Sequence, residues 1–196
     1  MVGTPIGNLA DITLRALDVL RKVDLVAAED TRVTSRLLDH HGIAVRIISV
    51  RSQNERDGAR RIIAELAAGH SAAYVTDAGT PGISDPGALL VDAVRAAGYR
   101  VIPVPGASAL AALLSVAGLD CLPMLFCGFL PAQPAARRRI LEGLRGGDHG
   151  LVFYEAPHRI VECAEDLASE LGAGRLICLA RELTKRFEQS VRLPAG

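Results

Sequence analysis

The feature that most constrains this sequence is the alternation of short apolar runs with amphipathic helical patterns. Apolar runs of strand length occur at residues 25–28, 45–50, 72–76, 101–104, 125–127, 151–154 and 176–180. Between them, apolar residues recur at helical spacing over residues 12–23, 59–66, 90–97 and 110–117. Strands that alternate with helices at this pitch favour βαβ units, in which parallel strands are covered by helices on both faces. The predicted fold class is therefore α/β.

The pattern is interrupted near the middle of the chain by the segment PVPGA, residues 103–107. Its two prolines are incompatible with a continuous helix or a central strand, because proline fixes φ and lacks an N–H group. A chain of 196 residues with 49% hydrophobic residues is long enough for two small α/β lobes. We predict an N-terminal α/β lobe at residues 1–104 and a C-terminal α/β lobe at residues 105–196.

Charge and composition give only weak guidance about partners. The 22 basic and 22 acidic side chains cancel, so any attraction to nucleic acid must come from a local patch. No apolar run approaches the length of about 20 residues that spans a bilayer, and we recognise no signal peptide. The four cysteines lack metal-ligand spacing and lie among apolar residues, which predicts buried thiols and no metal site. We expect a cytoplasmic protein without membrane contact.

Polar and glycine-rich clusters follow the predicted strands, each at the carboxyl end of a strand. The first is EDTR at residues 29–32, and Asn54 with Glu55 follows the next strand. Further clusters begin at Asp77, Pro105, Gly128, Glu155 and Arg181. In open parallel sheets the ligand crevice lies outside the carboxyl ends of the strands. We therefore expect these clusters to converge on one site.

The densest cluster is DAGTPGISDPG at residues 77–87. Glycine allows close backbone approach and proline stiffens the loop, so this segment suits a small ligand held by backbone groups. It contains neither GxxxxGK[ST] nor GxGxxG, so the usual phosphate-binding patterns are absent. The alternative is a set of tight turns that only connect a strand to a helix. Residues 4–8, TPIGN, form a shorter loop of the same kind, with Asp11 available to cap the next helix.

Seven sequence blocks are spread over nearly the whole chain in a fixed order. They are TPIGNLAD (4–11), AAEDTR (27–32), DAGTPGISDPG (77–87), PGASA (105–109), GFLP (128–131), FYEAPHR (153–159) and LARELTK (179–185). In order and spacing they resemble the ribosomal small-subunit methyltransferase I family. That family comprises the 16S rRNA (cytidine-1402) 2'-O-methyltransferases and is part of the tetrapyrrole methylase superfamily.

The resemblance implies a fold, a cofactor and a substrate. The implied architecture is two α/β lobes of tetrapyrrole-methylase type with S-adenosylmethionine in the cleft between them, in a homodimer. The implied reaction is methylation of the 2'-hydroxyl of a decoding-centre cytidine in 16S rRNA, either naked or within the small ribosomal subunit. The family also continues beyond the RELTK block into further strands, so the C-terminal lobe is expected to be truncated.

Resemblance to the superfamily places the cofactor against the TPIGN, DAGTP and PGASA loops, whose backbone groups can hold its adenosyl and methionine parts. Methyl transfer from a sulfonium disperses charge and needs no metal, so alignment and exclusion of water are the main contributions of the protein. The expected cofactor-binding residues are Pro5, Asp77, Ala78, Gly79, Thr80, Pro81, Asp85, Ser108 and Ala109.

A ribose hydroxyl is a poor nucleophile until its proton is removed or polarised, so a base or a cation should face the methyl group. The candidate catalytic residues are Glu29, Asp30, Glu155, His158, Glu182 and Lys185. Each has an alternative role. Glu29 and Asp30 could instead cap the helix that begins near Thr31. His158 could be only a polar first-turn residue, and Glu182 and Lys185 could form only a surface ion pair.

Contacts to RNA are expected chiefly from arginines. Arg137, Arg138 and Arg139 head a predicted helix and could contact phosphates, with Arg159, Arg181, Lys185 and Arg186 around the cleft. The alternative for the three-arginine run is a solvated helix face. The chain has no Trp, and recognition of structured RNA by shape and backbone does not require aromatic stacking. The expected substrate-binding residues are Arg32, Asn54, Glu55, Arg137, Arg138, Arg139, Arg159 and Arg181.

Two other functions share parts of this pattern. A tetrapyrrole or other small-molecule methyltransferase would share the lobes and the cofactor cleft, but the EDTR, EAPHR and RELTK set matches the rRNA branch. A catalytically silent RNA-binding ribosome-assembly factor is the alternative from a different class. Binding of S-adenosylmethionine by the purified protein discriminates between that factor and a methyltransferase.

Overall fold

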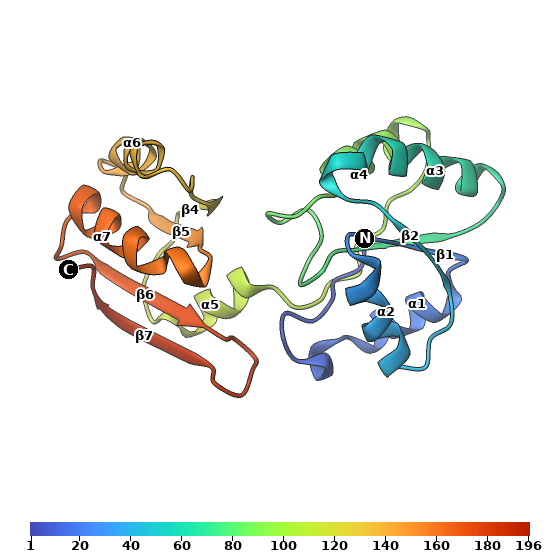
Figure 1. Cartoon of the computed structure of the whole chain (residues 1–196), viewed down its shortest axis with the longest axis horizontal. Helices are drawn as coiled ribbons and strands as arrows, with labels where there is room; N and C mark the ends of the chain where they lie inside the picture. The colour runs from blue at the N-terminus through green and yellow to red at the C-terminus, as the bar shows by residue number, and fades with distance from the viewer. The chain divides into compact units, whose positions relative to one another are not determined.

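The computed structural model describes all residues from 1 to 196, and the chain divides into two compact units (Figure 1). Unit 1 comprises Met1–Ala109 and unit 2 comprises Leu110–Gly196. Both units combine helices with strands, which confirms the predicted α/β fold class. The lobe boundary expected after residue 104, and the cleft, stay predictions. No helix has both the length and the apolar character needed to cross a bilayer.

Unit 1 is built on a parallel sheet. Its strands are β1 (Leu25–Ala28), β2 (Arg46–Ser49) and β3 (Ala72–Val75), in the order β2-β1-β3. Every residue of the central strand β1 is buried, as a strand covered on both faces must be. The first residues of the chain extend the sheet, because the Val2 N–H donates to the Tyr74 carbonyl at 2.9 Å.

The prediction of a strand over residues 101–104 is wrong for most of its length. Only Val104 pairs, in a parallel bridge with Val2. The Val104 N–H donates to the Met1 carbonyl at 2.8 Å, and the Gly3 N–H donates to the Val104 carbonyl at 3.0 Å. Pro103 has no N–H group to contribute to a longer ladder. The pairing nevertheless fixes the start of the chain between β3 and the segment that leads to PGASA.

Helices cover both faces of this sheet (Figure 1). The helices α1 (Leu14–Lys22) and α2 (Thr31–His40) lie on one face, and α3 (Glu55–Ala67) and α4 (Ala88–Ala96) lie on the other. Short 3-10 turns, η1 (Leu9–Asp11) and η2 (Ser52–Asn54), precede α1 and α3. Successive side chains of a strand point to opposite faces. Val26 therefore packs with Leu20 of α1, whereas Ala27 packs with Ile62 of α3.

Thr13, not Asp11, caps α1, because the Thr13 side chain accepts the Ala16 N–H at 3.1 Å. The expectation for Asp11 is therefore wrong: Asp11 lies two residues before the capping position, inside η1. A threonine hydroxyl three residues before the N–H that it accepts is a common N-terminal cap.

Unit 2 contains two separate pairs of strands. β4 (Met124–Phe129) pairs in parallel with β5 (Gly150–Tyr154), and β6 (Leu176–Arg181) pairs antiparallel with β7 (Gln189–Pro194). The helices of this unit are α5 (Ala109–Ala117), α6 (Pro134–Leu144), the 3-10 turn η3 (Pro157–Arg159) and α7 (Ile160–Leu171). The helices α6 and α7 pack together over Leu130, Leu141 and Cys163. Cys163 is the one buried cysteine, and the other three are half-buried free thiols, contrary to expectation.

The hairpin of β6 and β7 departs from the expected, largely parallel arrangement. In β7, QSVRLP, polar and apolar residues alternate, so no apolar run marks the strand. Leu179 lies opposite Val191, and Ile177 lies opposite Leu193. Such cross-strand pairs are the unit of sheet stabilisation. Pairing with β6 therefore makes a strand of a segment whose own composition gives only a weak signal.

Candidate functional site

Three glycine-containing loops of unit 1 meet at the carboxyl edge of the parallel sheet. Thr4 and Gly79 exchange backbone hydrogen bonds of 2.8 and 3.1 Å, which join TPIGN to DAGTP. The Thr80 hydroxyl donates to the Ala107 carbonyl at 3.2 Å, which joins DAGTP to PGASA. The loops that the sequence analysis assigns to the cofactor are thus brought together within one unit.

Glycines let these loops approach more closely than other residues would. A Cβ atom on Gly106 would lie 2.9 Å from the Gly3 backbone, and one on Gly3 would lie 2.7 Å from the Gly106 nitrogen. Gly79 has a φ of 78°, which favours glycine, and a Cβ atom there would lie 3.2 Å from Ile6 Cγ2. Backbone groups therefore make up much of this region, which we call the loop cradle (residues 4–8, 77–81 and 105–109).

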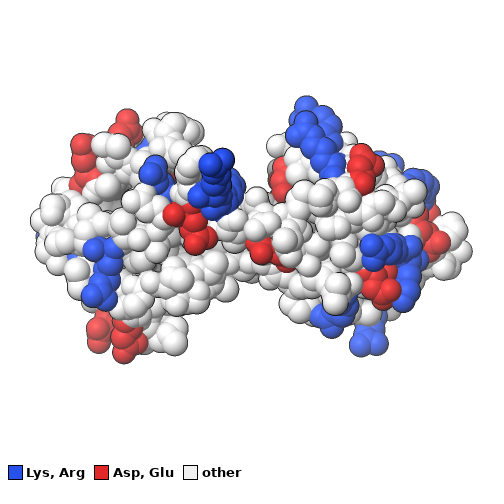
Figure 2. Space-filling model, turned by 90° about the horizontal axis from the view of Figure 1, so that it is seen from below, with Lys and Arg blue, Asp and Glu red and all other residues white.

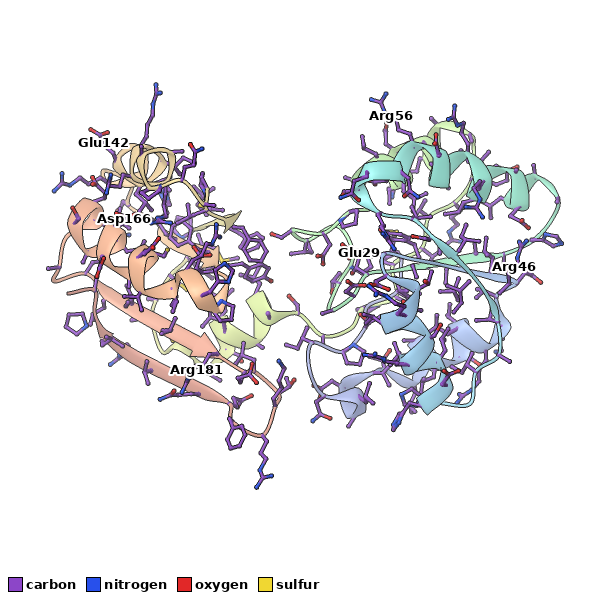
Figure 3. The ribbon with its side chains drawn as sticks, viewed as in Figure 1. Glu29, Arg46, Arg56, Glu142, Asp166 and Arg181 are labelled. Atoms are coloured by element: carbon purple, nitrogen blue, oxygen red, sulfur yellow. The ribbon has the colours of Figure 1, made fainter.

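Acidic side chains gather beside the loop cradle, with Glu29 at the end of β1 (Figure 3). The Asp77 N–H donates to the Glu29 carboxylate at 3.3 Å, and the Asp30 N–H donates to the Asp77 carboxylate at 2.9 Å. Burial raises the pKa of Glu29, and repulsion from Asp77 and Asp30 adds to the effect. Burial also raises the pKa of Asp85 to about 6, with further repulsion from Glu29.

The raised pKa of Asp85 gives a pH-dependent expectation for stability. Because the pKa of Asp85 is higher in the folded chain, ionisation of Asp85 lowers the free energy of unfolding. This destabilisation is complete above about pH 6 and absent below the ordinary pKa of 3.8. Replacing Asp85 by Asn should therefore raise the free energy of unfolding by about 1 kcal/mol at neutral pH, after allowance for solvent screening. The gain should disappear as the pH falls from about 6 to about 4. Urea unfolding at both ends of this range checks it; an equal gain at both would contradict it.

Asp30 takes the helix-capping role that the sequence analysis left as an alternative. Its carboxylate accepts the Arg32 N–H at 2.8 Å and caps α2. It also forms an ion pair with the Arg32 guanidinium at 2.6 Å, which holds the pKa of Asp30 well below its usual range. Glu29 forms no ion pair, so it is the acidic group of EDTR whose charge is not already neutralised by a cation.

Glu55, an expected substrate-binding residue, is buried, and its role in contacting substrate stays a prediction. Its carboxylate accepts the N–H groups of Gly87 and Leu90, both at 2.9 Å, at the start of α4. A carboxylate at a helix N-terminus satisfies backbone donors that have no partner within the helix. Glu55 therefore anchors α4 to α3. Its neighbour Asn54 is exposed and lines a cavity of about 340 Å³ together with Ser52 and Arg56.

Arg137, an expected contact to RNA, also lies in the interior of its unit. Its side chain is 1% exposed, and its Nε donates to the Asp166 carboxylate of α7 at 2.6 Å. Arg138 reaches the same carboxylate at 3.3 Å and is half exposed, whereas Arg139 is exposed. On the face in Figure 2, basic and acidic side chains are interspersed. The three arginines therefore do not form one phosphate-binding run.

The EAPHR segment of unit 2 is tied to the GFLP segment through Arg159. The Glu155 carboxylate is 6% exposed and accepts the Arg159 Nε–H at 2.7 Å, and Arg159 Nη2 donates to the Leu130 carbonyl at 3.3 Å. Arg159 thereby holds the ends of β4 and β5 together. The other Glu155 oxygen, Oε2, is buried without a hydrogen-bond partner. His158 is exposed in η3.

The RELTK segment after β6 is a strained turn. Glu182 and Thr184 have φ angles of 51° and 68°, and Ser84 in DAGTPGISDPG has 62°; no other residue besides glycine has a positive φ. Such strain concentrates at functional sites. Lys185 and Glu182 form the surface ion pair that was the alternative reading, at 3.1 Å. Arg181 Nε donates to Gln189 Oε1 across the hairpin at 2.8 Å.

Thr76 is a polar residue of this region that the sequence analysis missed. It is 2% exposed, and its side chain lies beside the Asp85 carboxyl, where a hydrogen bond from Thr76 opposes the rise of that carboxyl's pKa. It immediately follows β3, and the Thr4 hydroxyl donates to its carbonyl at 3.2 Å. The available signal was its place as the polar last residue of the apolar run at residues 72–76, directly before Asp77.

Comparison with known proteins shows the family to which this chain belongs. A family model described as Tetrapyrrole (Corrin/Porphyrin) Methylases matches residues 1–196. A Xylella fastidiosa protein named ribosomal RNA small subunit methyltransferase I is 55% identical over 188 residues, which cover 96% of this chain and 69% of that protein. The chain belongs to the ribosomal RNA small subunit methyltransferase I family of the tetrapyrrole methylases. It is therefore a methyltransferase, as the seven sequence blocks predict.

Other relatives agree with this assignment. The Escherichia coli O157:H7 protein of the same name is 48% identical over 196 residues, which cover the whole chain and 68% of that protein. Among solved structures, the methyltransferase CobJ superimposes with a TM-score of 0.69 at 20% identity, over 95% of this chain and 81% of that chain. The uroporphyrin-III-C-methyltransferase of Thermus thermophilus gives 0.65 at 21% identity, over 99% and 83%. These two likenesses confirm the fold.

Proposed function

We propose that this chain transfers a methyl group from S-adenosylmethionine to the 2'-hydroxyl of a cytidine in 16S rRNA, of the cytidine-1402 type. The observation that carries the proposal is the meeting of TPIGN, DAGTP and PGASA in a backbone-lined cradle. The cradle belongs to a chain whose relatives, 48% and 55% identical, are named ribosomal RNA small subunit methyltransferase I. The relatives' name supports small-subunit rRNA as the substrate and argues against a tetrapyrrole.

The loop cradle brings together backbone N–H and carbonyl groups of three loops, which supports binding of S-adenosylmethionine there. A Cβ atom on Gly3, Gly79 or Gly106 would intrude on neighbouring atoms, so the cradle depends on bare backbone. Residues 77–81 and 105–109 would hold the adenosyl and methionine parts through N–H and carbonyl groups, as Pro5, Ser108 and Ala109 are expected to do. S-Adenosylmethionine supplies the electrophilic methyl group when bound. The protein's part is then to align the two reactants and exclude water.

The RELTK turn supports a role for unit 2 in activating the hydroxyl. The positive φ angles of Glu182 and Thr184 are energetically unfavourable for residues other than glycine, and such strain is concentrated at functional sites. The Lys185 ammonium can stabilise negative charge that develops on the ribose oxygen, and Glu182 can accept its proton. We propose Glu182 and Lys185, which pair with each other at 3.1 Å in this strained turn, as the catalytic pair. Asn54, Arg139 and Arg181 are proposed as contacts to RNA, and His158 is proposed as a further catalytic residue.

Single-turnover methyl transfer to small-subunit rRNA tests this assignment. Lys185→Ala and Glu182→Gln should each slow the transfer by at least about 10²-fold, because loss of a positioned proton-transfer group typically has such an effect. The affinity for S-adenosylmethionine should stay nearly unchanged. Glu165→Gln, on the exposed face of α7, is the matched control and should transfer at the parent rate. Parent-like rates for both test variants would remove RELTK from the catalytic site.

We also propose that the chain forms a homodimer and acts in the cytoplasm. Leu122 and Phe187 of unit 2 are 74% and 73% exposed. Large exposed apolar side chains commonly mark surfaces that contact another protein. They support a homodimer, and rRNA as the substrate supports action in the cytoplasm.

A further inference from the structure

Three aromatic rings of unit 2 meet at the carboxyl ends of the paired strands β4 and β5 (Figure 1). The ring centroids of Phe126 and Tyr154 are 5.0 Å apart, and those of Phe129 and Tyr154 are 5.6 Å apart, both in edge-to-face contact. The whole chain has only four Phe and three Tyr, so this gathering uses a large share of its aromatic rings. We call Phe126, Phe129 and Tyr154 the aromatic platform.

A β-bulge in β4 brings the three rings to one face of the strand pair. The register with β5 shifts by one residue between Phe126 and Gly128, so Cys127 is an extra residue in β4. Side chains alternate between the two faces along a strand, so without this extra residue the two phenylalanines of β4 would point to opposite faces. With it, Phe129 lies opposite Tyr154, on the face that carries Phe126. Bulges commonly redirect a side chain in this way beside an active site.

The aromatic platform lies on the face of the strand pair that is turned away from the core under α6 and α7. Phe153, the neighbour of Tyr154 in β5, points to the opposite face and packs into that core. Phe126 and Tyr154 are half-buried, whereas Phe129 is 55% exposed. The two half-buried rings therefore support an exposed, flat apolar ring at the end of a parallel strand, where ligands of α/β proteins bind.

The charges beside the aromatic platform suit a ligand that is both flat and negatively charged. Strand β4 contains no charged side chain, and the Glu155 carboxylate at the end of β5 is paired with Arg159. Arg159 also donates to the carbonyl of Leu130, the residue that follows Phe129. The His158 side chain beside it is exposed. A guanidinium and an imidazole thus border the exposed ring. RNA matches both features, because its bases are flat and its phosphates are negative.

We infer that the aromatic platform, through Phe129, stacks on the base of the cytidine whose ribose receives the methyl group. The inference rests on the proposed function. Proteins that recognise RNA by sequence commonly take unstacked bases and stack them on aromatic side chains. The cytidine gives up stacking with its neighbours in the RNA when it enters the enzyme, and the Phe129 ring replaces that contact. A base held in this way fixes its ribose, so the 2'-hydroxyl is aligned for the transfer.

Single-turnover methyl transfer to naked small-subunit rRNA, measured over a range of RNA concentrations, tests the inference. Phe129→Leu keeps an apolar side chain but removes the ring, and it should lower the transfer rate at low RNA concentration by at least about tenfold. Phe129→Tyr keeps the ring and should transfer within about threefold of the parent rate. Leu176→Ala is the matched control, because Leu176 is 53% exposed at the amino end of β6, and it should transfer at the parent rate.

Two further measurements on Phe129→Leu separate stacking from other roles of the ring. Calorimetry should show the parent affinity for S-adenosylmethionine, because the ring contacts the base and not the methyl donor. The dependence of RNA affinity on salt concentration should also match that of the parent, because this dependence reports contacts to phosphates and Phe129 makes none.

The possible outcomes separate the inference from the function on which it rests. Transfer by Phe129→Leu at the parent rate, or by Phe129→Tyr as slowly as by Phe129→Leu, would overturn the inference. A parallel loss of S-adenosylmethionine affinity would assign the ring to the cofactor, and a changed oligomeric state in sedimentation would assign it to a contact between copies; either result would overturn the inference too. If the unaltered, folded chain transfers no methyl group to rRNA, the proposed function itself fails. Thermal melting shows that each variant is folded before it is assayed.

Discussion

Replacing Asp166 by Ala is expected to lower the free energy of unfolding of unit 2 by about 3–5 kcal/mol. Arg137 is 1% exposed and Asp166 is 7% exposed, and their ion pair joins α6 to α7. Removal of the carboxylate leaves a guanidinium charge in the interior that has neither water nor a full counter-charge. The nearest other carboxylate, that of Glu162, is 3.8 Å from Arg137 Nη2 and mostly exposed.

Urea unfolding followed by circular dichroism measures this effect. Arg139→Ala is the matched control, because Arg139 is an exposed neighbour in the same run, and its effect should stay within about 0.5 kcal/mol. The double variant Arg137→Met with Asp166→Leu should be less destabilised than Asp166→Ala, because it removes both charges together. If Asp166→Ala lowers the free energy of unfolding by less than about 1 kcal/mol, the ion pair is not needed to stabilise the buried Arg137 charge.

Replacing Gly106 by Ala is expected to abolish measurable binding of S-adenosylmethionine and to destabilise unit 1 by about 1–3 kcal/mol. The new Cβ atom would lie 2.9 Å from the carbonyl carbon, Cα and oxygen of Gly3. These are backbone atoms, so relief requires movement of the segment that joins TPIGN to PGASA. The loop cradle would open at its tightest point.

Calorimetry and thermal unfolding of the same preparation check both parts. Gly143→Ala serves as the control, because Gly143 lies inside α6 and a Cβ atom there meets nothing within 4 Å. That change should raise stability by about 0.5–1 kcal/mol, since alanine favours the helix. Binding by Gly106→Ala at the parent affinity would show that the cofactor does not use the loop cradle.

Much of unit 1 is predictable from the sequence because its determinants are local. The apolar run at residues 25–28 is a buried central strand because both faces of β1 are covered by helices. The glycine loops follow strand ends, and parallel topology puts those ends on one edge. The order of strands and helices along the chain was therefore enough to predict that these loops lie together. Which carboxylates stay free of cations is a tertiary property and could not be predicted.

The contacts of Arg137, Glu55 and β7 involve partners that are distant in the sequence. Arg137 belongs to a charge run on an amphipathic helix, and its partner Asp166 lies on another helix. Glu55 faces N–H groups at the start of α4, on the next helix along the chain. In both cases a buried charge is stabilised by groups that a local pattern does not include. β7 was missed for a related reason, because its pairing with β6 decides its conformation.

Mapping of ribose methylation in rRNA tests the central claim most directly. Small-subunit rRNA from a strain that lacks this enzyme would be incubated with the purified chain and S-adenosylmethionine, then cleaved with alkali, which cannot cut beside a 2'-O-methylated nucleotide. We expect one new alkali-resistant position, at a cytidine, that depends on the methyl donor and disappears with Gly106→Ala. Methylation confined to a base, or no methylation of rRNA by a chain that binds S-adenosylmethionine, would contradict it.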